Sequence, residues 1–159
     1  MVNVFLLLGS NLGDRKLFLQ QANEHISEEV APIITTSAIY ETQSWGKTDS
    51  PDYLNQVVVI RTELSAKIIL QRILNIEWKI GRIREEKWGP RIIDIDILFY
   101  GDSLIDEPDL QVPHPELHKR RFTLDPLAEI APDLIHPVLH KTILQLKNEL
   151  TDNLIVKKL

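Results

Sequence analysis

Residues 88–101 read WGPRIIDIDILFYG, and the alternation I-D-I-D-I inside this stretch is typical of a strand with one buried face. Successive side chains of a strand point to opposite faces, so three isoleucines share one face and Asp94 and Asp96 share the other. The strand rise places the Cα atoms of the two aspartates roughly 6.6 Å apart. The stretch therefore predicts a sheet with one face on an apolar core and two carboxylates on the other.

Similar patterns predict the other strands and helices of the chain. Hydrophobic periodicity predicts strands at 3–8, 33–42, 53–62 and 93–98, and helices at 15–29, 66–80, 123–130 and 141–149. Asp14 and Ser65 precede the first two helices and are suited to cap them. The order β-α-β-β-α-β predicts an α+β, ferredoxin-like antiparallel sheet with helices packed on one face, followed by extra C-terminal elements.

Length and composition suit one domain, which we place at residues 1–159. The chain is 43% hydrophobic and contains no cysteine, which excludes disulfides, thiolate zinc sites and a cysteine nucleophile. No apolar run approaches the roughly 20 residues of a membrane helix, and the first residues lack the basic segment of a signal peptide. We therefore expect a cytoplasmic protein that does not associate with membranes.

Charge is unevenly distributed along the chain. The net charge of -5 argues against general nucleic-acid binding. Basic residues nevertheless cluster at Lys79, Arg82, Arg84, Lys87 and Arg91, and again at Lys119, Arg120 and Arg121. Such concentration in an acidic chain indicates a focused anion site, although a solvated basic loop would have the same composition.

Asp94 and Asp96 are candidate ligands for a divalent cation. Mg²⁺ prefers oxygen ligands and is commonly held by one or two carboxylates together with substrate phosphates. Arg82, Arg84 and Arg91 lie close by in sequence, and arginines stabilise the charge that develops in phosphoryl transfer. Two other interpretations stay open, namely an acidic solvent-facing strand and a set of Arg–Asp salt bridges.

Several further residues are suited to contact a flat heterocycle or a phosphate. In PDYLNQVVVI, Tyr53 and Asn55 share one strand face, where an Asn amide can read a heterocycle edge and an aromatic ring can stack on it. Trp45 and Phe122 are further stacking candidates, although this pattern alone more often indicates an aromatic core residue beside a turn-forming Asn. Glu77 falls inside the apolar arc of the helix at 66–80, so it either has a buried partner or lies at the edge of the arc.

Taken together, these segments resemble the 6-hydroxymethyl-7,8-dihydropterin pyrophosphokinase family. The resemblance runs almost end to end through LLLGSNLGDR, YET, PDYLNQVV, IEWKIGRIR, WGPRIIDIDILFYG and VPHPELHKRRFTLDPLAEIAP. It implies a ferredoxin-like fold, ATP as co-substrate, two Mg²⁺ ions, and transfer of pyrophosphate from ATP to a pterin alcohol in folate biosynthesis with release of AMP. Small molecules would be its substrates, and no obligate protein partner is implied.

The resemblance also implies roles for individual residues. Asp94 and Asp96 would bind both metal ions, with Arg82 and Arg91 in catalysis. The implied ATP site comprises Glu77, Arg84, Trp88, Arg91, Ile97, His114 and Arg120. The implied pterin site comprises Thr42, Trp45, Tyr53, Asn55, Trp88, Asp94, Asp96 and Phe122. Without the resemblance, another two-metal phosphoryl or nucleotidyl transferase and a non-catalytic ferredoxin-like ligand-binding module remain alternatives.

Overall fold

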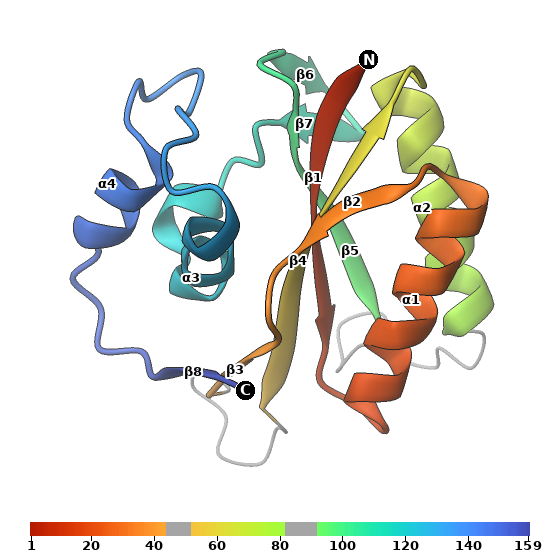
Figure 1. Cartoon of the computed structure of the whole chain (residues 1–159), viewed down its shortest axis with the longest axis horizontal. Helices are drawn as coiled ribbons and strands as arrows, with labels where there is room; N and C mark the ends of the chain where they lie inside the picture. Colours follow the sequence, from red (N-terminus) through yellow and green to blue (C-terminus); the bar gives the residue numbers. More distant parts are fainter. Residues whose placement is uncertain (44–51, 82–91) are drawn as a thin grey trace.

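An antiparallel sheet with helices on both faces forms the body of the protein (Figure 1). The structure is a computed structural model that describes residues 1–43, 52–81 and 92–159. Its main sheet contains β1 (Val2–Ser10), β2 (Ile33–Thr36), β3 (Tyr40–Thr42), β4 (Tyr53–Thr62), β5 (Asp94–Tyr100) and β8 (Val156–Lys158), while β6 (Ile105–Glu107) and β7 (Leu110–Val112) form a separate hairpin. The helices are α1 (Arg15–Glu29), α2 (Ala66–Ile80), η1 (Leu117–Lys119, a 3₁₀ turn), α3 (Arg121–Ile130) and α4 (Ile143–Asn148).

The strand order confirms the predicted ferredoxin-like arrangement. The sheet runs β5-β1-β4-β3-β8, with β2 also paired to β4, and every pair is antiparallel. The helices α1 and α2 follow β1 and β4, as a β-α-β-β-α-β order requires. Both begin where the sequence predicted, because the Asp14 and Ser65 side chains accept hydrogen bonds from the first-turn N–H groups of Leu17 and Ile68.

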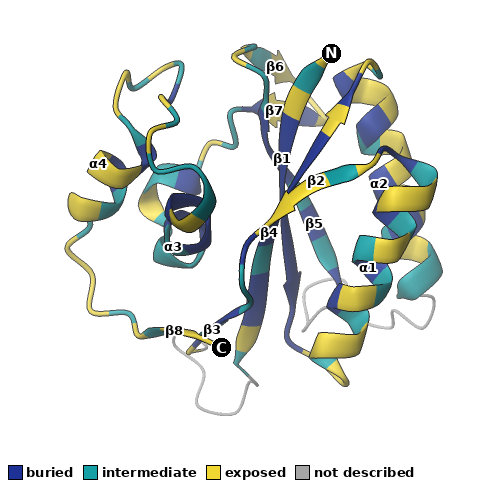
Figure 2. Ribbon diagram, viewed as in Figure 1, coloured by how far each residue is buried: buried dark blue, intermediate teal, exposed yellow. Residues whose placement is uncertain are grey.

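The continuous apolar run of β1 supplies core residues to both faces of the sheet. Val4, Leu6 and Leu8 pack with α1 and α2, whereas Phe5 and Leu7 pack with α3 and α4. Figures 1 and 2 show the two helix layers on opposite sides of the buried strands. The predicted single helical layer is thus present as α1 and α2, and the C-terminal helices cover part of the other face.

The prediction of one strand over residues 33–42 is wrong, because the chain bends after Thr36. The Ser37 hydroxyl accepts a hydrogen bond from the Val57 N–H at 2.9 Å and donates to the Ala38 carbonyl at 2.7 Å. The Ser37 hydroxyl thus takes the place of a backbone carbonyl as the acceptor for the Val57 N–H, and the regular pairing with β4 is interrupted there. As a result, β2 and β3 pair with different parts of β4. The strands β6, β7 and β8 were not predicted, because each has only three residues. Among the described helices, none is long and apolar enough to cross a bilayer.

The buried histidine beside α4 predicts a loss of stability in acid. His136 is 4% exposed, and its Nδ1 accepts hydrogen bonds from the Val138 and Leu139 N–H groups. Burial, and then the charges of His118 and His140, hold the pKa of His136 below its ordinary value. The unfolded chain therefore takes up a proton at a higher pH than the folded protein, so stability is full above the unfolded pKa and falls as pH drops below about 6.5.

We expect His136→Asn, which keeps an acceptor but does not titrate, to flatten this acid dependence by up to about 1.4 kcal/mol per pH unit. Urea unfolding of both proteins between pH 8 and pH 5 measures the effect. The difference at pH 8 serves as the baseline, because His136 is neutral there in both states. Parallel pH profiles for the two proteins would contradict the prediction.

Candidate active site

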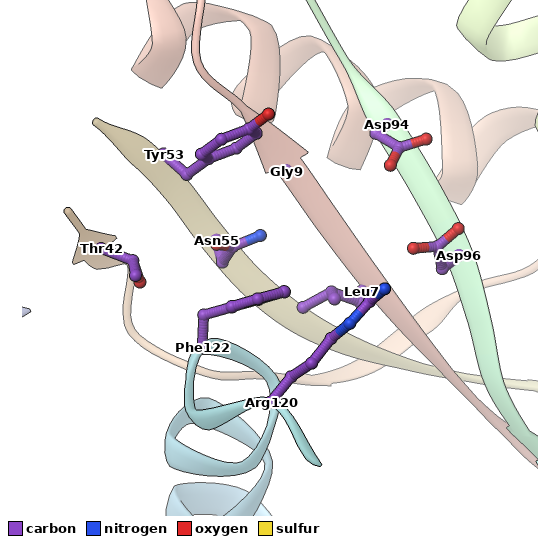
Figure 3. Close-up of a pocket in the computed structure, with 9 residues that line it drawn as sticks. All are labelled: Leu7, Gly9, Thr42, Tyr53, Asn55, Asp94, Asp96, Arg120 and Phe122. Carbon is purple, nitrogen blue, oxygen red and sulfur yellow. The ribbon is translucent and has the colours of Figure 1, made fainter. Parts of the chain in front are cut away.

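A pocket of about 300 Å³ opens on the face of the sheet that also carries α3. Its lining comes from four strands and from the N-terminal end of α3, namely Leu7, Gly9, Thr42, Tyr53, Asn55, Asp94, Asp96, Arg120 and Phe122 (Figure 3). Seven of these nine residues were predicted as site residues from sequence. The sheet brings them together because β3, β4, β1 and β5 are neighbours in that order.

Gly9 forms the floor of the pocket between the amide and the acids. It lies opposite Asn55 on one side and opposite Asp94 on the other in the two ladders of β1. A Cβ atom at this position would lie 2.8 Å from Nδ2 of Asn55. The missing side chain therefore creates the hollow between these two polar residues.

Two buried polar side chains flank this hollow with unused hydrogen-bonding atoms. Thr42 is 3% exposed and Asn55 is 4% exposed. Asn55 donates from Nδ2 to the Leu8 carbonyl at 3.3 Å, but its Oδ1 and the Thr42 hydroxyl have no hydrogen-bond partner among the described residues. Since buried polar atoms are nearly always paired, these two atoms are suited to bind a polar ligand.

Aromatic and cationic side chains enclose the rest of the pocket. Tyr53, which is 40% exposed, lies beside Thr42 in the ladder between β3 and β4. Phe122 enters from the start of α3, and the Arg120 guanidinium carbon lies 5.5 Å from the centre of its ring. Figure 3 shows Arg120 extending beside Phe122 toward Leu7. This arrangement presents ring faces and a positive charge to the same cavity.

Three carboxylates crowd together at the β5 side of the site. Asp94 and Asp96 project from one face of β5, as the alternation predicted, while Ile93, Ile95 and Ile97 are buried in the core with α1 and α2. Glu77 accepts a hydrogen bond from the Ile95 N–H at 2.8 Å, so it has a buried partner. Burial raises the pKa of Glu77 to about 8, and the charges of Asp94 and Asp96 add to this although the Ile95 bond opposes it.

His114 and Ile97 have different surroundings from the pocket residues. The Nδ1 atom of His114 accepts from the Glu116 N–H at 3.1 Å, so Nε2 carries the ring proton and can donate. Burial, and then the Arg120 charge, lower the pKa of His114, which keeps the ring neutral. The Ile97 side chain is 5% exposed and packs in the core with α1 and α2, on the face of the sheet away from the pocket. Only its main-chain atoms could therefore contact a nucleotide.

The remaining candidates lie outside the described residues. They are Trp45, Arg82, Arg84, Trp88 and Arg91. Sequence reasoning missed two pocket residues. Leu7 lies in an apolar run that was interpreted as core alone, and Gly9 lies in GSNLGD, which was interpreted as a turn that ended the strand at residue 8. A glycine directly after an apolar strand was the available signal, since such a glycine often marks close approach of a ligand.

Most of the chain matches one family of known proteins. The family model for 7,8-dihydro-6-hydroxymethylpterin-pyrophosphokinase matches residues 5–132. A 2-amino-4-hydroxy-6-hydroxymethyldihydropteridine pyrophosphokinase of Aquifex aeolicus is 43% identical over 151 residues, covering 95% of this chain and 94% of the relative. The Haemophilus influenzae protein of the same description is 38% identical over 158 residues, covering 99% and 98%. A folic acid synthesis protein of Pneumocystis carinii is 37% identical over 150 residues, covering 94% of this chain and 20% of that protein.

Solved structures agree at the level of fold. A Plasmodium falciparum HPPK-DHPS crystal structure superposes with a TM-score of 0.79 at 21% sequence identity. The match covers 93% of this chain and 45% of the Plasmodium chain. At this identity the likeness supports the fold assignment, and the sequence relatives support the family.

Proposed function

The chain belongs to the 7,8-dihydro-6-hydroxymethylpterin-pyrophosphokinase family, and on this premise we propose the reaction that it carries out. It is an ATP-dependent diphosphokinase that transfers a pyrophosphoryl group to 6-hydroxymethyl-7,8-dihydropterin in folate synthesis. In the proposed reaction the pterin hydroxymethyl oxygen attacks the β-phosphorus of ATP. The hydroxyl proton is released to solvent, the bond from that phosphorus to the α,β-bridging oxygen breaks, and AMP leaves with the electron pair.

One observation carries the proposal, namely the row of residues across Gly9. The buried Thr42 Oγ1 and Asn55 Oδ1 atoms, which have no hydrogen-bond partner in the part of the chain that the structure describes, lie on one side of this glycine, and Asp94 and Asp96 lie on the other. The first pair can accept and donate hydrogen bonds along a pterin edge, while Tyr53 and Phe122 offer ring faces. A flat heterocycle in this pocket would direct a substituent toward the acids of β5.

The acids suit the Mg²⁺ that the proposed reaction requires. Asp94 and Asp96 would hold the ions, and a nearby cation would also relieve the repulsion that contributes to the raised pKa of Glu77. Among the described residues, no group of three or more His, Asp or Glu side chains could hold a metal alone. Two protein carboxylates completed by phosphate oxygens and water is the usual arrangement for Mg²⁺ in nucleotide enzymes. Two ions, when bound, would neutralise phosphate charge and lower the pKa of the attacking hydroxyl.

Other side chains of the chain would bind and orient the phosphates. Arg120 reaches the pocket with a permanent charge, and His114 can donate from Nε2 because its Nδ1 is already an acceptor. We assign Arg82 and Arg91 to charge stabilisation as the bridging oxygen departs, with Arg84 on the phosphates and Trp88 on the rings. Glu77 supports the metal site from α2 through its bond to β5.

Product identification tests the proposed function directly. The protein is incubated with ATP, Mg²⁺ and 6-hydroxymethyl-7,8-dihydropterin, and the products are identified by mass spectrometry. We expect AMP and the pterin pyrophosphate in equal amounts, with no reaction when EDTA removes the metal. Formation of ADP or of free pyrophosphate would instead indicate a different phosphoryl or nucleotidyl transfer and would overturn the assignment.

Thr42→Val is expected to weaken pterin binding without destabilising the fold. The substitution preserves volume but removes a buried hydroxyl that has no partner in the described structure, so the free energy of unfolding should stay the same or rise by about 1 kcal/mol. The KM for the pterin should rise about tenfold, because the ligand then loses one buried hydrogen bond. Urea unfolding and steady-state kinetics measure the two effects. An unchanged KM would show that Thr42 does not contact the pterin.

A further inference from the structure

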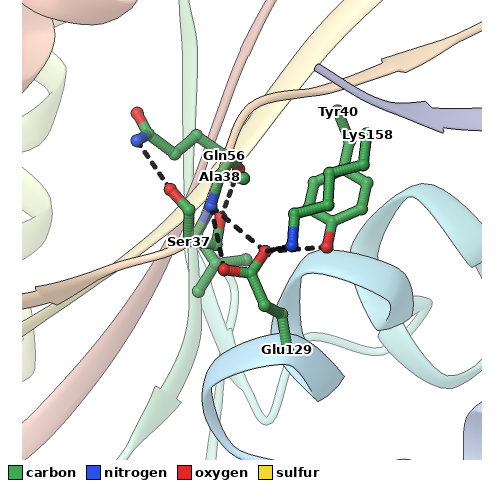
Figure 4. A network of polar contacts seen from close by, with 7 residues as sticks. Ser37, Ala38, Tyr40, Gln56, Glu129 and Lys158 are labelled. Atoms are coloured by element: carbon green, nitrogen blue, oxygen red, sulfur yellow. Dashed lines mark hydrogen bonds and ion pairs between the residues drawn. The ribbon is translucent and has the colours of Figure 1, made fainter.

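The carboxylate of Glu129, near the end of α3, contacts β3, β8 and the connection between β2 and β3 (Figure 4). Both oxygens of Glu129 accept from the Ala38 N–H, at 3.1 and 3.2 Å. Its Oε1 also accepts from the Tyr40 hydroxyl at 2.7 Å and lies 3.9 Å from Nζ of Lys158 on β8. The side chain of Glu129 is only 27% exposed, so these contacts are partly shielded from water.

The contacts of Glu129 lead directly to the pocket. Tyr40 is 8% exposed and lies opposite Asn55 in the ladder between β3 and β4. Thr42 is two residues further along β3, so its side chain points to the same face as that of Tyr40. Burial, and then the bond to Glu129, raise the pKa of Tyr40 far above its ordinary value, so its hydroxyl remains a donor.

The strand that Glu129 holds is short and begins at a bend. β3 has three residues, and the preceding segment is tied to β4 through Ser37, which exchanges hydrogen bonds with the Val57 main chain at 2.8 and 2.9 Å and accepts from Gln56 at 3.0 Å. By contrast, α3 is held by the apolar core through Thr123, Leu124 and Leu127, which are at most 1% exposed. β3 keeps its ladders with β4 and β8, so loss of the Glu129 contacts would tilt it relative to α3 rather than release it, while Phe122 and Arg120 keep their places.

We propose that Glu129, acting through Tyr40 and Ala38, is a positioning residue that sets the Thr42 and Asn55 edge of the pocket and so selects for the pterin ring. The inference rests on the proposed function, because it assigns the pterin to that edge. Glu129, Tyr40 and Ala38 do not themselves line the pocket, whereas Thr42 and Asn55 do. The consequence is specific, in that binding of the pterin depends on Glu129 and binding of ATP does not.

Glu129→Gln tests this with little change in shape. A Gln side chain keeps one oxygen for the Ala38 N–H and the Tyr40 hydroxyl, but it removes the negative charge that strengthens these bonds and the Lys158 ion pair, and it places an NH₂ group where Oε2 accepts from the Ala38 N–H. We expect the Kd for the pterin, measured by titration with Mg²⁺ and a non-hydrolysable ATP analogue, to weaken about tenfold. The Kd for the analogue alone should change less than about twofold, as should kcat at saturating pterin.

Matched variants separate positioning from general destabilisation. Glu149→Gln removes a comparable 2.8 Å ion pair with Lys141, remote from the pocket lining, and should leave both Kd values at the wild-type level. Tyr40→Phe keeps the ring and removes one donor, so it should weaken pterin binding less than Glu129→Gln. The double variant should lose less than the sum of the two single losses, because both remove the same hydrogen bond.

The outcomes decide between the two proposals. A wild-type pterin Kd in folded Glu129→Gln overturns the positioning role even if its melting temperature falls, and equal weakening of pterin and ATP analogue does the same. If Glu129→Gln does not fold, an unchanged pterin Kd in Tyr40→Phe overturns it. Failure of the wild-type protein to bind the pterin would instead refute the proposed function.

Discussion

Asp96→Asn is expected to lower turnover by about 10³-fold, because loss of several kcal/mol of charge stabilisation at the proposed metal site raises the barrier correspondingly. The Asn amide is neutral and is a much weaker ligand for Mg²⁺ than a carboxylate. The fold should survive, since the change alters one of three crowded carboxyl groups beside β5 rather than a buried apolar contact. Steady-state turnover at saturating ATP, pterin and Mg²⁺ measures the effect, and urea unfolding checks the fold.

Asp102→Asn provides the matched control for this substitution. Asp102 is an exposed carboxylate in the turn just after β5, so its loss changes the net charge equally without touching the pocket. Its turnover should be within about twofold of wild type, as for most surface substitutions. Turnover of Asp96→Asn close to wild type would refute the assignment of this aspartate to the metal.

Gly9→Ala is expected to weaken pterin binding by about 100-fold, since a methyl group in the floor of the pocket displaces the Asn55 amide, which we propose to hydrogen-bond the ligand. The added Cβ would lie 2.8 Å from Nδ2 of Asn55, which must then give up its bond to the Leu8 carbonyl. Overpacking of this kind also costs about 1–3 kcal/mol of stability. Calorimetric titration with pterin and ATP analogue measures the binding.

The double variant Gly9→Ala/Asn55→Ala tests the cause of the loss. Truncation of Asn55 removes the clash, so the free energy of unfolding should recover relative to Gly9→Ala alone. Pterin binding should not recover, because the amide is absent. If the single variant binds the pterin normally, the ring does not lie over Gly9 and the proposed pocket is wrong.

Much of the site was predictable from local patterns. The alternation around Asp94 and Asp96 required both carboxylates to leave β5 on the same face, and the structure confirms that they do. The position of Glu77 inside an apolar arc required a buried partner or an edge position, and the Ile95 N–H is that partner. In both cases the period of the element determines the face, and neighbouring residues are enough to reveal it.

Other features depended on which strands meet. The bend at Ser37 follows from a hydrogen bond to Val57, twenty residues away, and nothing in the segment 33–42 indicates it. The edge strand β8 has three residues, and its pairing with β3 supplies the hydrogen bonds that its own sequence does not specify. The hydrophobic periodicity of a segment cannot predict such contacts, because they depend on pairing with residues far away in the chain.

The sequence by itself determined the order of the main elements, the faces of β1, β4 and β5, and the residue types at the site, because side-chain period and capping act over a few residues. Only the tertiary structure decided that Gly9 would open a hollow between Asn55 and Asp94, and that Glu129 would hold the β3 edge. These last two features arise from antiparallel register and from packing of α3 across the sheet. Both features join residues that are far apart in the chain, so they form only when the strands have paired and α3 has packed on the sheet.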